Sequence, residues 1–165
     1  MAQVYVSVGS NIDREAMVRS CVAALDEVFA NLMKSSVYES IAVGFEGDNF
    51  YNLVVGFTAD DPLEVARRLR EIEVAHGRHR GEKRFAPRTL DLDLLLFGDQ
   101  DLHDQGLDVP RAEITRYAFV LGPLAELAPW AVHPLLGKTY QELWSEFCVN
   151  HPTEADSIWP VTFPW

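Results

Sequence analysis

The chain has 165 residues, 48% of them hydrophobic and 24% charged, and it carries a formal net charge of −11 at pH 7. Such a length and composition predict one globular domain spanning residues 1–165 and exclude a disordered chain. The acidic balance argues against a general nucleic-acid binder or a protein of anionic membrane surfaces, because both gain affinity from positive charge.

The N-terminal segment alternates apolar and polar side chains over residues 4–8, which predicts a strand that stops at the turn-prone Gly9. It lacks the basic start and apolar run of an export signal, and no stretch reaches the ~18 consecutive apolar residues of a membrane span. We therefore expect a cytoplasmic protein. Apolar residues at helical spacing follow and predict an amphipathic helix up to about residue 29. Cys21 and Cys148 lack metal-binding spacing and are expected as reduced thiols.

The middle of the chain predicts two further strands, over residues 32–40 and 50–58, joined by a polar loop that contains glycine. A second helix follows them. Its start is marked by Asp61 as N-cap with Pro62 at the first helical position, and its end by Gly77 just beyond the last turn.

The C-terminal half predicts a strand over residues 89–97 and a short helix over 118–128. The tail from residue 150 onward is rich in proline and tryptophan and is expected to be irregular but packed. The order strand, helix, strand, strand, helix, strand predicts an α+β fold, in which helices cover a mostly antiparallel sheet.

Two aspartates, Asp91 and Asp93, alternate with leucines inside the strand predicted over 89–97. Side chains at i and i+2 share one face of a strand, so both carboxylates are expected to project together, about 7 Å apart at Cα. Mg²⁺ takes oxygen ligands and is often held by one or two carboxylates together with substrate phosphates. The pair therefore predicts a metal site, while the same alternation also fits the polar face of an exposed edge strand.

A basic run, RHRGEKRFAPR over residues 78–88, comes directly before this strand and contains four arginines and one lysine in an otherwise acidic protein. The planar guanidinium group suits phosphate oxygens, and Gly77 and Gly81 indicate a mobile lid. A basic lid beside paired carboxylates is typical of magnesium-dependent polyphosphate chemistry. The sequence contains neither a P-loop motif nor the signatures of protein kinases.

The stretch RFAPRTLDLDLLLFG resembles the signature of the 6-hydroxymethyl-7,8-dihydropterin pyrophosphokinase family, and the similarity extends to VSVGSN, FYNLVV, EIEVAHGRHR and AFVLGPLAELAP. The resemblance implies a ferredoxin-like three-layer α-β-α sandwich with helices on both faces of the sheet. It also implies that the β,γ-diphosphate of ATP is transferred to the hydroxymethyl oxygen of the pterin in folate biosynthesis, with release of AMP. We expect a monomer whose partners are these small-molecule substrates.

The resemblance also assigns roles to individual residues. Asp91 and Asp93 are implied as ligands of two Mg²⁺ ions, and Arg78 and Arg88 are implied as further catalytic residues. The pterin is implied to bind at Phe50, Asn52, Phe119, Val43 and Gly44. ATP is implied to bind at Glu73, Arg80, Arg84, Phe85, Arg88 and Arg111. Phosphoryl-type transfer requires mostly positioning and charge neutralisation, so no strong general base is needed.

The chain departs from the family pattern mainly on the nucleotide side. Arg111 replaces a frequent histidine, Gly81 a basic residue and Phe85 the lid tryptophan, whereas Tyr117 stands in place of an arginine that is shifted to Arg116. These departures leave open a divergent homologue that binds the pterin with weak or no diphosphate transfer. An unrelated ferredoxin-like interaction domain is a third interpretation, which requires the motif match to be accidental.

Purely structural interpretations exist for several of these residues. Phe50 and Phe119 also fit as core aromatics, and Glu73 also fits as a solvated helix residue. Asn52 is more informative, because an amide inside a strand needs a hydrogen-bonding partner. His133 has no acidic or histidine neighbour at metal-ligand spacing, so we expect a structural role for it.

Overall fold

The computed structural model describes residues 1–41, 47–77 and 90–165. Two short 3₁₀ turns, His103–Gln105 and Ala112–Thr115, lie between the last central strand and the third helix. The helices and strands are, in chain order, β1 (Ala2–Ser10), α1 (Arg14–Val28), β2 (Ala30–Lys34), β3 (Val37–Ser40), β4 (Phe50–Ala59), α2 (Pro62–Ala75), β5 (Asp91–Phe97), α3 (Ala118–Leu127), α4 (Tyr140–Asn150), α5 (Pro152–Ala155) and β6 (Ile158–Val161).

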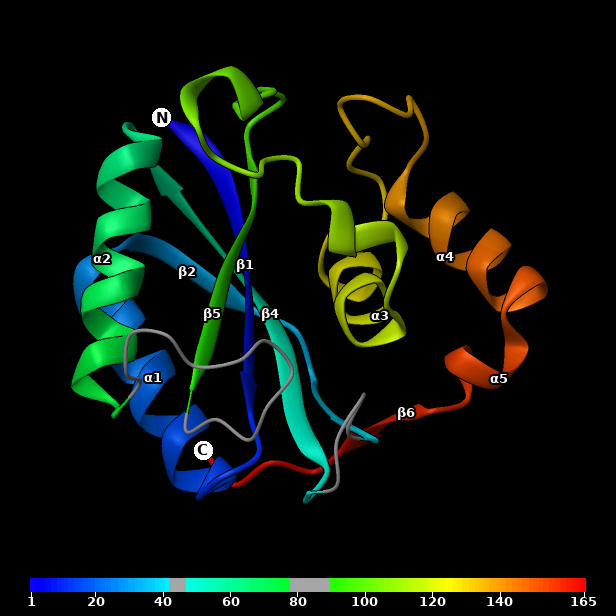
Figure 1. Cartoon of the computed structure of the whole chain (residues 1–165), viewed down its shortest axis with the longest axis horizontal. Helices are drawn as coiled ribbons and strands as arrows, with labels where there is room; N and C mark the ends of the chain where they lie inside the picture. Colours follow the sequence, from blue (N-terminus) through cyan, green and yellow to red (C-terminus); the bar gives the residue numbers. More distant parts are fainter. Residues whose placement is uncertain (42–46, 78–89) are drawn as a thin grey trace.

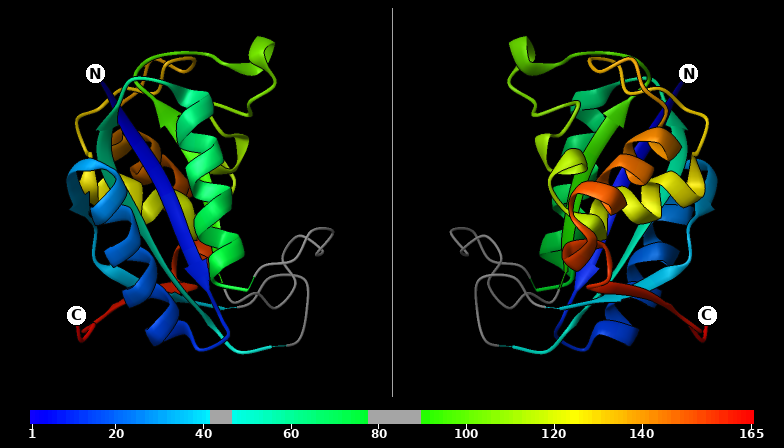
Figure 2. Two further views of the ribbon diagram at one scale, coloured as in Figure 1. Left: turned by 90° about the vertical axis from the view of Figure 1, so that its left-hand side faces the viewer. Right: turned by 90° about the vertical axis from the view of Figure 1, so that its right-hand side faces the viewer.

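In the described residues, one sheet of six strands forms the middle layer, with the order β5-β1-β4-β3-β6 and with β2 also paired to β4. All of these pairs are antiparallel. Figure 1 shows α1 and α2 on one side of the sheet and α3 and α4 on the other, and the side views of Figure 2 show the same layers. The predicted α+β class and α-β-α layering are therefore confirmed.

Each face of the sheet buries its own apolar cluster. Because side chains alternate along a strand, Val4, Val6 and Val8 of β1 pack towards α1 and α2. Val54 of β4 and Leu96 of β5 pack on the opposite face, with α3 and α4. Polar residues at the same alternation as Val54 therefore face the α3 layer.

The helix α2 begins and ends where its capping residues predict. Asp61 accepts a hydrogen bond from the Leu63 N–H, Pro62 is the first helical residue, and Gly77 has a positive φ of 92° just beyond the C-cap. Glycine adopts this conformation without strain, which explains the stop.

The single strand predicted over 32–40 is wrong, because the structure breaks it into β2 and β3. At the break, the Ser35 hydroxyl accepts a hydrogen bond from the Val54 N–H, so a side chain takes the place of a backbone group in the ladder. The next residue, Ser36, directs its N–H and hydroxyl to Glu126 of α3 instead of to the sheet.

The irregular tail predicted from residue 150 is also wrong, because this segment contains α5 and β6, and β6 pairs with β3 at the sheet edge. Pro160 lies within β6, a position that an edge strand tolerates but that hides the strand in the sequence. The packing of the tail is as expected: Phe163 contacts Tyr51 edge to face, and Arg19 donates to the Pro164 carbonyl.

Two further sequence expectations can be compared with the described residues. Cys21 is buried and Cys148 half-buried, and both are free thiols, as expected. Among the helices of residues 1–41, 47–77 and 90–165, none has the length and apolar character required to span a bilayer.

Candidate active site

Asp91 and Asp93 lie on one face of β5, as the alternation predicts. Their strand partners on β1 are Gly9 and Ser7, while the intervening Leu92 is buried on the opposite face. Within the part of the chain that the structure describes, β5 is also an edge strand of the sheet. The two carboxylates therefore share a face of an edge strand, and their role as metal ligands stays a prediction.

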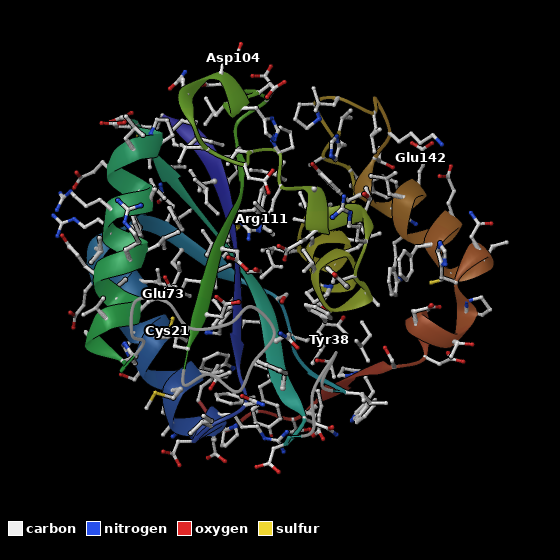
Figure 3. The ribbon with its side chains drawn as sticks, viewed as in Figure 1. Cys21, Tyr38, Glu73, Asp104, Arg111 and Glu142 are labelled. Atoms are coloured by element: carbon white, nitrogen blue, oxygen red, sulfur yellow. The ribbon has the colours of Figure 1, made fainter. Side chains whose placement is uncertain are left out.

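Glu73 connects α2 to this strand. Its carboxylate accepts a hydrogen bond of 2.9 Å from the Leu92 N–H, between the two aspartates, and only 9% of the residue is exposed. Figure 3 shows Glu73 between α2 and β5. The interpretation of Glu73 as a solvated helix residue is therefore wrong, because the side chain occupies a backbone donor at the sheet edge.

Arg111 lies close to Asp93. Its backbone N–H donates to the Leu95 carbonyl of β5 at 3.0 Å, which fixes the start of its side chain beside the strand. Its Nη2 atom is 3.3 Å from Oδ1 of Asp93 and 3.0 Å from Oε1 of Glu113. Figure 3 shows Arg111 beside β5, towards α3. The buried Glu113 was not singled out from the sequence, where nothing separates it from a surface glutamate.

A cavity of about 160 Å³ follows the outer edge of β5, between α2 and the segment 107–111. One part of its lining is apolar and includes Leu69, Leu94 and Leu107. Another part is charged and includes Glu73, Asp93 and Arg111. Two residues implied for ATP and one implied for metal thus line a single cavity.

Asn52 lies two strands away from Asp91, on the same face of the sheet. Gly9 of β1 is the strand partner of both residues, so the spacing of neighbouring strands places Asp91 and Asn52 about 10 Å apart. The amide is 8% exposed, and its Oδ1 accepts a hydrogen bond of 2.5 Å from the buried Ser40 hydroxyl. Ser40 is the hydrogen-bonding partner that the sequence required for Asn52 without identifying it.

Gly9 lies between Asp91 and Asn52 in the sheet, and its lack of a side chain leaves space between them. A Cβ atom built on Gly9 would lie 2.9 Å from Nδ2 of Asn52 and 3.8 Å from the ring of Phe50. The first distance is shorter than real Cβ contacts, so any larger residue here would displace the amide. Phe50 and Asn52 thus flank Gly9 on the face that carries both aspartates.

Phe119 is half-buried in the first turn of α3 and packs against the apolar cluster on that same face of the sheet. Its ring stacks on Tyr117, with centroids 5.0 Å apart. Glu126, at the other end of α3, accepts hydrogen bonds from the Tyr38 hydroxyl at 2.5 Å and from the Ser36 N–H at 2.8 Å. These bonds tie the helix that carries Phe119 to the strand that carries Ser40.

The donor set fits magnesium better than a transition metal. Within the described residues, no group of three or more histidine, cysteine, aspartate or glutamate side chains could enclose a metal ion. Two carboxylates on one strand face do match the way Mg²⁺ is commonly held, with the remaining positions filled by water and substrate phosphates.

His133 has the structural role that the sequence indicates. Its Nδ1 accepts hydrogen bonds from the N–H groups of Leu135 and Leu136 at 3.1 and 3.3 Å. Burial lowers the pKa of the imidazole, which favours the neutral ring that can accept these bonds.

Several implied site residues lie outside the described residues, in the ranges 42–46 and 78–89. Their roles stay predictions. They are Val43 and Gly44 for the pterin, Arg78 and Arg88 for catalysis, and Arg80, Arg84 and Phe85 for ATP.

Comparison with known proteins identifies relatives of the chain. Residues 5–129 match the family model described as 7,8-dihydro-6-hydroxymethylpterin-pyrophosphokinase (HPPK). The 2-amino-4-hydroxy-6-hydroxymethyldihydropteridine pyrophosphokinase of Aquifex aeolicus is 34% identical over 149 residues, covering 88% of this chain and 92% of that protein. Its namesake in Bacillus subtilis is 41% identical over 128 residues, covering 74% of this chain and 76% of that protein.

The fold agrees with solved structures. A crystal structure of a triple mutant of Plasmodium falciparum HPPK-DHPS with pteroate superimposes with a TM-score of 0.72 at 13% identity and covers 96% of this chain. The chain spans only 46% of that longer protein. The likeness shows the ferredoxin-like fold of its HPPK part. The family match and the relative in Aquifex aeolicus establish that the chain belongs to the 7,8-dihydro-6-hydroxymethylpterin-pyrophosphokinase family.

Proposed function

We propose that this protein transfers diphosphate from ATP to the hydroxymethyl group of 6-hydroxymethyl-7,8-dihydropterin, giving AMP and the pterin diphosphate in folate biosynthesis. Family membership supports the reaction. The observation that carries the proposal is the strand register that places Asp91 and Asn52 on either side of Gly9. The separation of about 10 Å suits a two-ring heterocycle whose reacting group must reach the carboxylates.

ATP is proposed to bind along the edge of β5. The apolar part of the 160 Å³ cavity suits the adenosine, and its charged part, with Asp93 and Arg111, lies where the phosphates would continue towards the aspartates. Two Mg²⁺ ions, held by Asp91 and Asp93 together with phosphate oxygens, would supply charge neutralisation and alignment of the reacting oxygens. Arg78 and Arg88 are proposed to bind the transferred phosphates, with further contacts from Arg80, Arg84 and Phe85.

The pterin is proposed to bind between Phe50 and Phe119, with Asn52 at its polar edge. Because Oδ1 of Asn52 is taken by Ser40, the amide presents its Nδ2 donor, which suits an acceptor atom of the heterocycle. Aromatic faces and a fixed polar group together favour a flat, hydrogen-bonding ligand. Val43 and Gly44 are proposed to add contacts from their loop.

The protein's part in the reaction is positioning. Asn52 and the two rings would hold the pterin so that its hydroxymethyl oxygen faces the bound triphosphate, and Glu73 would keep β5 and its two carboxylates in register. The arginines would stabilise charge that develops on the transferred phosphates. No strong base is required. As the hydroxyl oxygen bonds to the β-phosphorus, the bond from that phosphorus to the α-phosphate oxygen breaks, AMP leaves and the hydroxyl proton passes to solvent.

We further propose that residues 1–165 form a single domain and that the protein acts as a cytoplasmic monomer. The packing of the C-terminal tail against β3 and α1 supports one structural unit in the described residues. Light scattering at several protein concentrations tests the monomer, and a mass that rises with concentration would contradict it.

The direct experiment is to incubate the protein with MgATP and 6-hydroxymethyl-7,8-dihydropterin and to measure AMP and pterin diphosphate together. We expect equal amounts of both products, and none when the pterin is omitted or when EDTA removes the metal. A well-folded protein that binds the pterin but releases no AMP would contradict the proposal and favour the divergent pterin-binding homologue.

A further inference from the structure

The ion pair between Arg111 and Asp93 involves one of the two carboxylates proposed to hold metal. Both side chains are 20% exposed, and the second partner of the guanidinium, Glu113, is 6% exposed at its side chain. Such a pair is shielded from water more than a surface salt bridge, so its charges interact more strongly. The anchored backbone of Arg111 limits how far the guanidinium can move.

The guanidinium and a divalent metal would compete for the same carboxylate. Nη2 of Arg111 is 3.3 Å from Oδ1 of Asp93, whereas a Mg²⁺ ion binds a carboxylate oxygen at about 2.0–2.1 Å. Two cations at one carboxylate repel each other, so metal binding at Asp93 is disfavoured while the guanidinium stays in place.

Arg111 also retains an unused donor. Its Nε is buried and has no hydrogen-bond partner in the part of the chain that the structure describes. Arg111 lines the cavity proposed for ATP, so a phosphate oxygen there could accept from the guanidinium. The contact with Asp93 is thus one of two arrangements that the side chain can satisfy.

We propose that Arg111 is a resident counter-ion of Asp93 that is exchanged for metal when a nucleotide binds. Without a nucleotide, the guanidinium neutralises Asp93 and keeps divalent metal weakly bound. When a triphosphate enters the cavity, the guanidinium turns to its oxygens, and Asp93 becomes available to the metal. This inference rests on the proposed function, since it requires metal at Asp93 and phosphates in the cavity.

The test measures Mn²⁺ binding by electron paramagnetic resonance, with nucleotide-free protein at low salt. We expect Arg111→Gln to bind Mn²⁺ about fivefold more tightly than the wild type, because a cation is removed from the carboxylate. Arg111→Lys, which keeps the charge, should resemble the wild type. Lys34→Gln, the same charge change at an exposed position of β2, should change the Mn²⁺ affinity by less than twofold. Thermal melting checks that each variant is folded.

A second titration uses a non-hydrolysable ATP analogue with saturating Mn²⁺. We expect Arg111→Gln to bind the analogue at least threefold more weakly, since the phosphates lose the guanidinium. Unchanged Mn²⁺ affinity in Arg111→Gln, or equal tightening in Lys34→Gln, would overturn the exchange. If Asp93→Asn leaves Mn²⁺ binding as in the wild type, the metal site of the proposed function fails instead.

Discussion

The two ends of the candidate site are built differently. At the Asn52 end, the groups are neutral and buried, and Ser40 fixes the amide by a hydrogen bond of 2.5 Å. At the Asp93 end, the groups are charged and partly exposed, and Arg111 lies 3.3 Å from the carboxylate. One end is formed before any ligand arrives, whereas the other holds charges that ligands can rearrange.

This difference reflects what each substrate requires. A flat heterocycle is recognised by shape and by a few hydrogen bonds, which a rigid, buried amide supplies at low entropic cost. A triphosphate with metal brings several charges at once, and these can replace the partners that Arg111 and Asp93 have in each other. The variants below test whether the two ends can be damaged separately.

The largest effect is expected from Asp93→Asn at the charged end. Turnover should fall by about 10³-fold or more, because the carboxylate that holds the metal loses its charge. The melting temperature and the affinity for the pterin should change little, since the side chain is partly exposed and keeps its size. Coupled measurement of AMP release and thermal melting checks this, with Asp99→Asn on an exposed turn as the control. Turnover within tenfold of the wild type would contradict the metal role.

A smaller effect is expected from Ser40→Ala at the neutral end, and it should concern the pterin. The pterin should bind roughly tenfold more weakly, because Oδ1 of Asn52 loses its buried partner and the amide is no longer fixed. The affinity for the ATP analogue should stay within twofold. Calorimetry with each ligand measures both values, and Ser40→Thr, which retains the hydroxyl, should restore pterin binding. Equal weakening of both ligands would show a general loss of structure rather than a pterin-specific role.

Glu126→Gln tests the support of the neutral end. The neutral amide weakens the hydrogen bonds that the Glu126 carboxylate accepts from Tyr38 and Ser36. We expect the free energy of unfolding to fall by about 1 kcal/mol after allowing for exposure. Because α3 carries Phe119, the pterin affinity should fall a few-fold as well. Urea unfolding measures the first effect, and Glu146→Gln, which is paired with Lys138 on the surface, is the matched control. A loss confined to nucleotide binding would contradict this placement.

The smallest effect concerns the segment that leads to Arg111. Hydrogen bonds from His103 to Asp101 and Asp108 raise the pKa of the exposed imidazole above its ordinary value. A raised pKa means that protonated His103 stabilises the folded state fully at pH values below the ordinary pKa of histidine. This stabilisation is lost as the pH rises through the pKa of the folded state. The melting temperature should therefore fall slightly more for the wild type than for His103→Gln between pH 6 and pH 8.5. Identical pH profiles of the two proteins would contradict a stabilising role of protonated His103.

Local patterns were sufficient for part of the fold and of the site. The capping residues of α2 act within one helical turn, and the shared face of Asp91 and Asp93 follows from the two-residue period of a strand. Such features depend on neighbours in the sequence, so they can be predicted without knowing the tertiary structure.

The remaining contacts join segments that are distant in sequence. Ser40 meets Asn52 only because β3 pairs with β4, and Glu73 meets the Leu92 N–H only because α2 packs beside β5. The break after β2 has the same origin, since Ser35 replaces a backbone group opposite Val54. A serine or glutamate that acts through a distant backbone group has no distinguishing pattern around it.

The proposed reaction requires that the carboxylates of β5 hold metal while Asn52 holds the pterin. The most direct measurement is the anomalous diffraction of crystals grown with Mn²⁺, a non-hydrolysable ATP analogue and 6-hydroxymethyl-7,8-dihydropterin. We predict anomalous peaks within bonding distance of Asp91 and Asp93 and a hydrogen bond between Nδ2 of Asn52 and the heterocycle. Metal peaks elsewhere, with both carboxylates turned away from the nucleotide, would contradict the account.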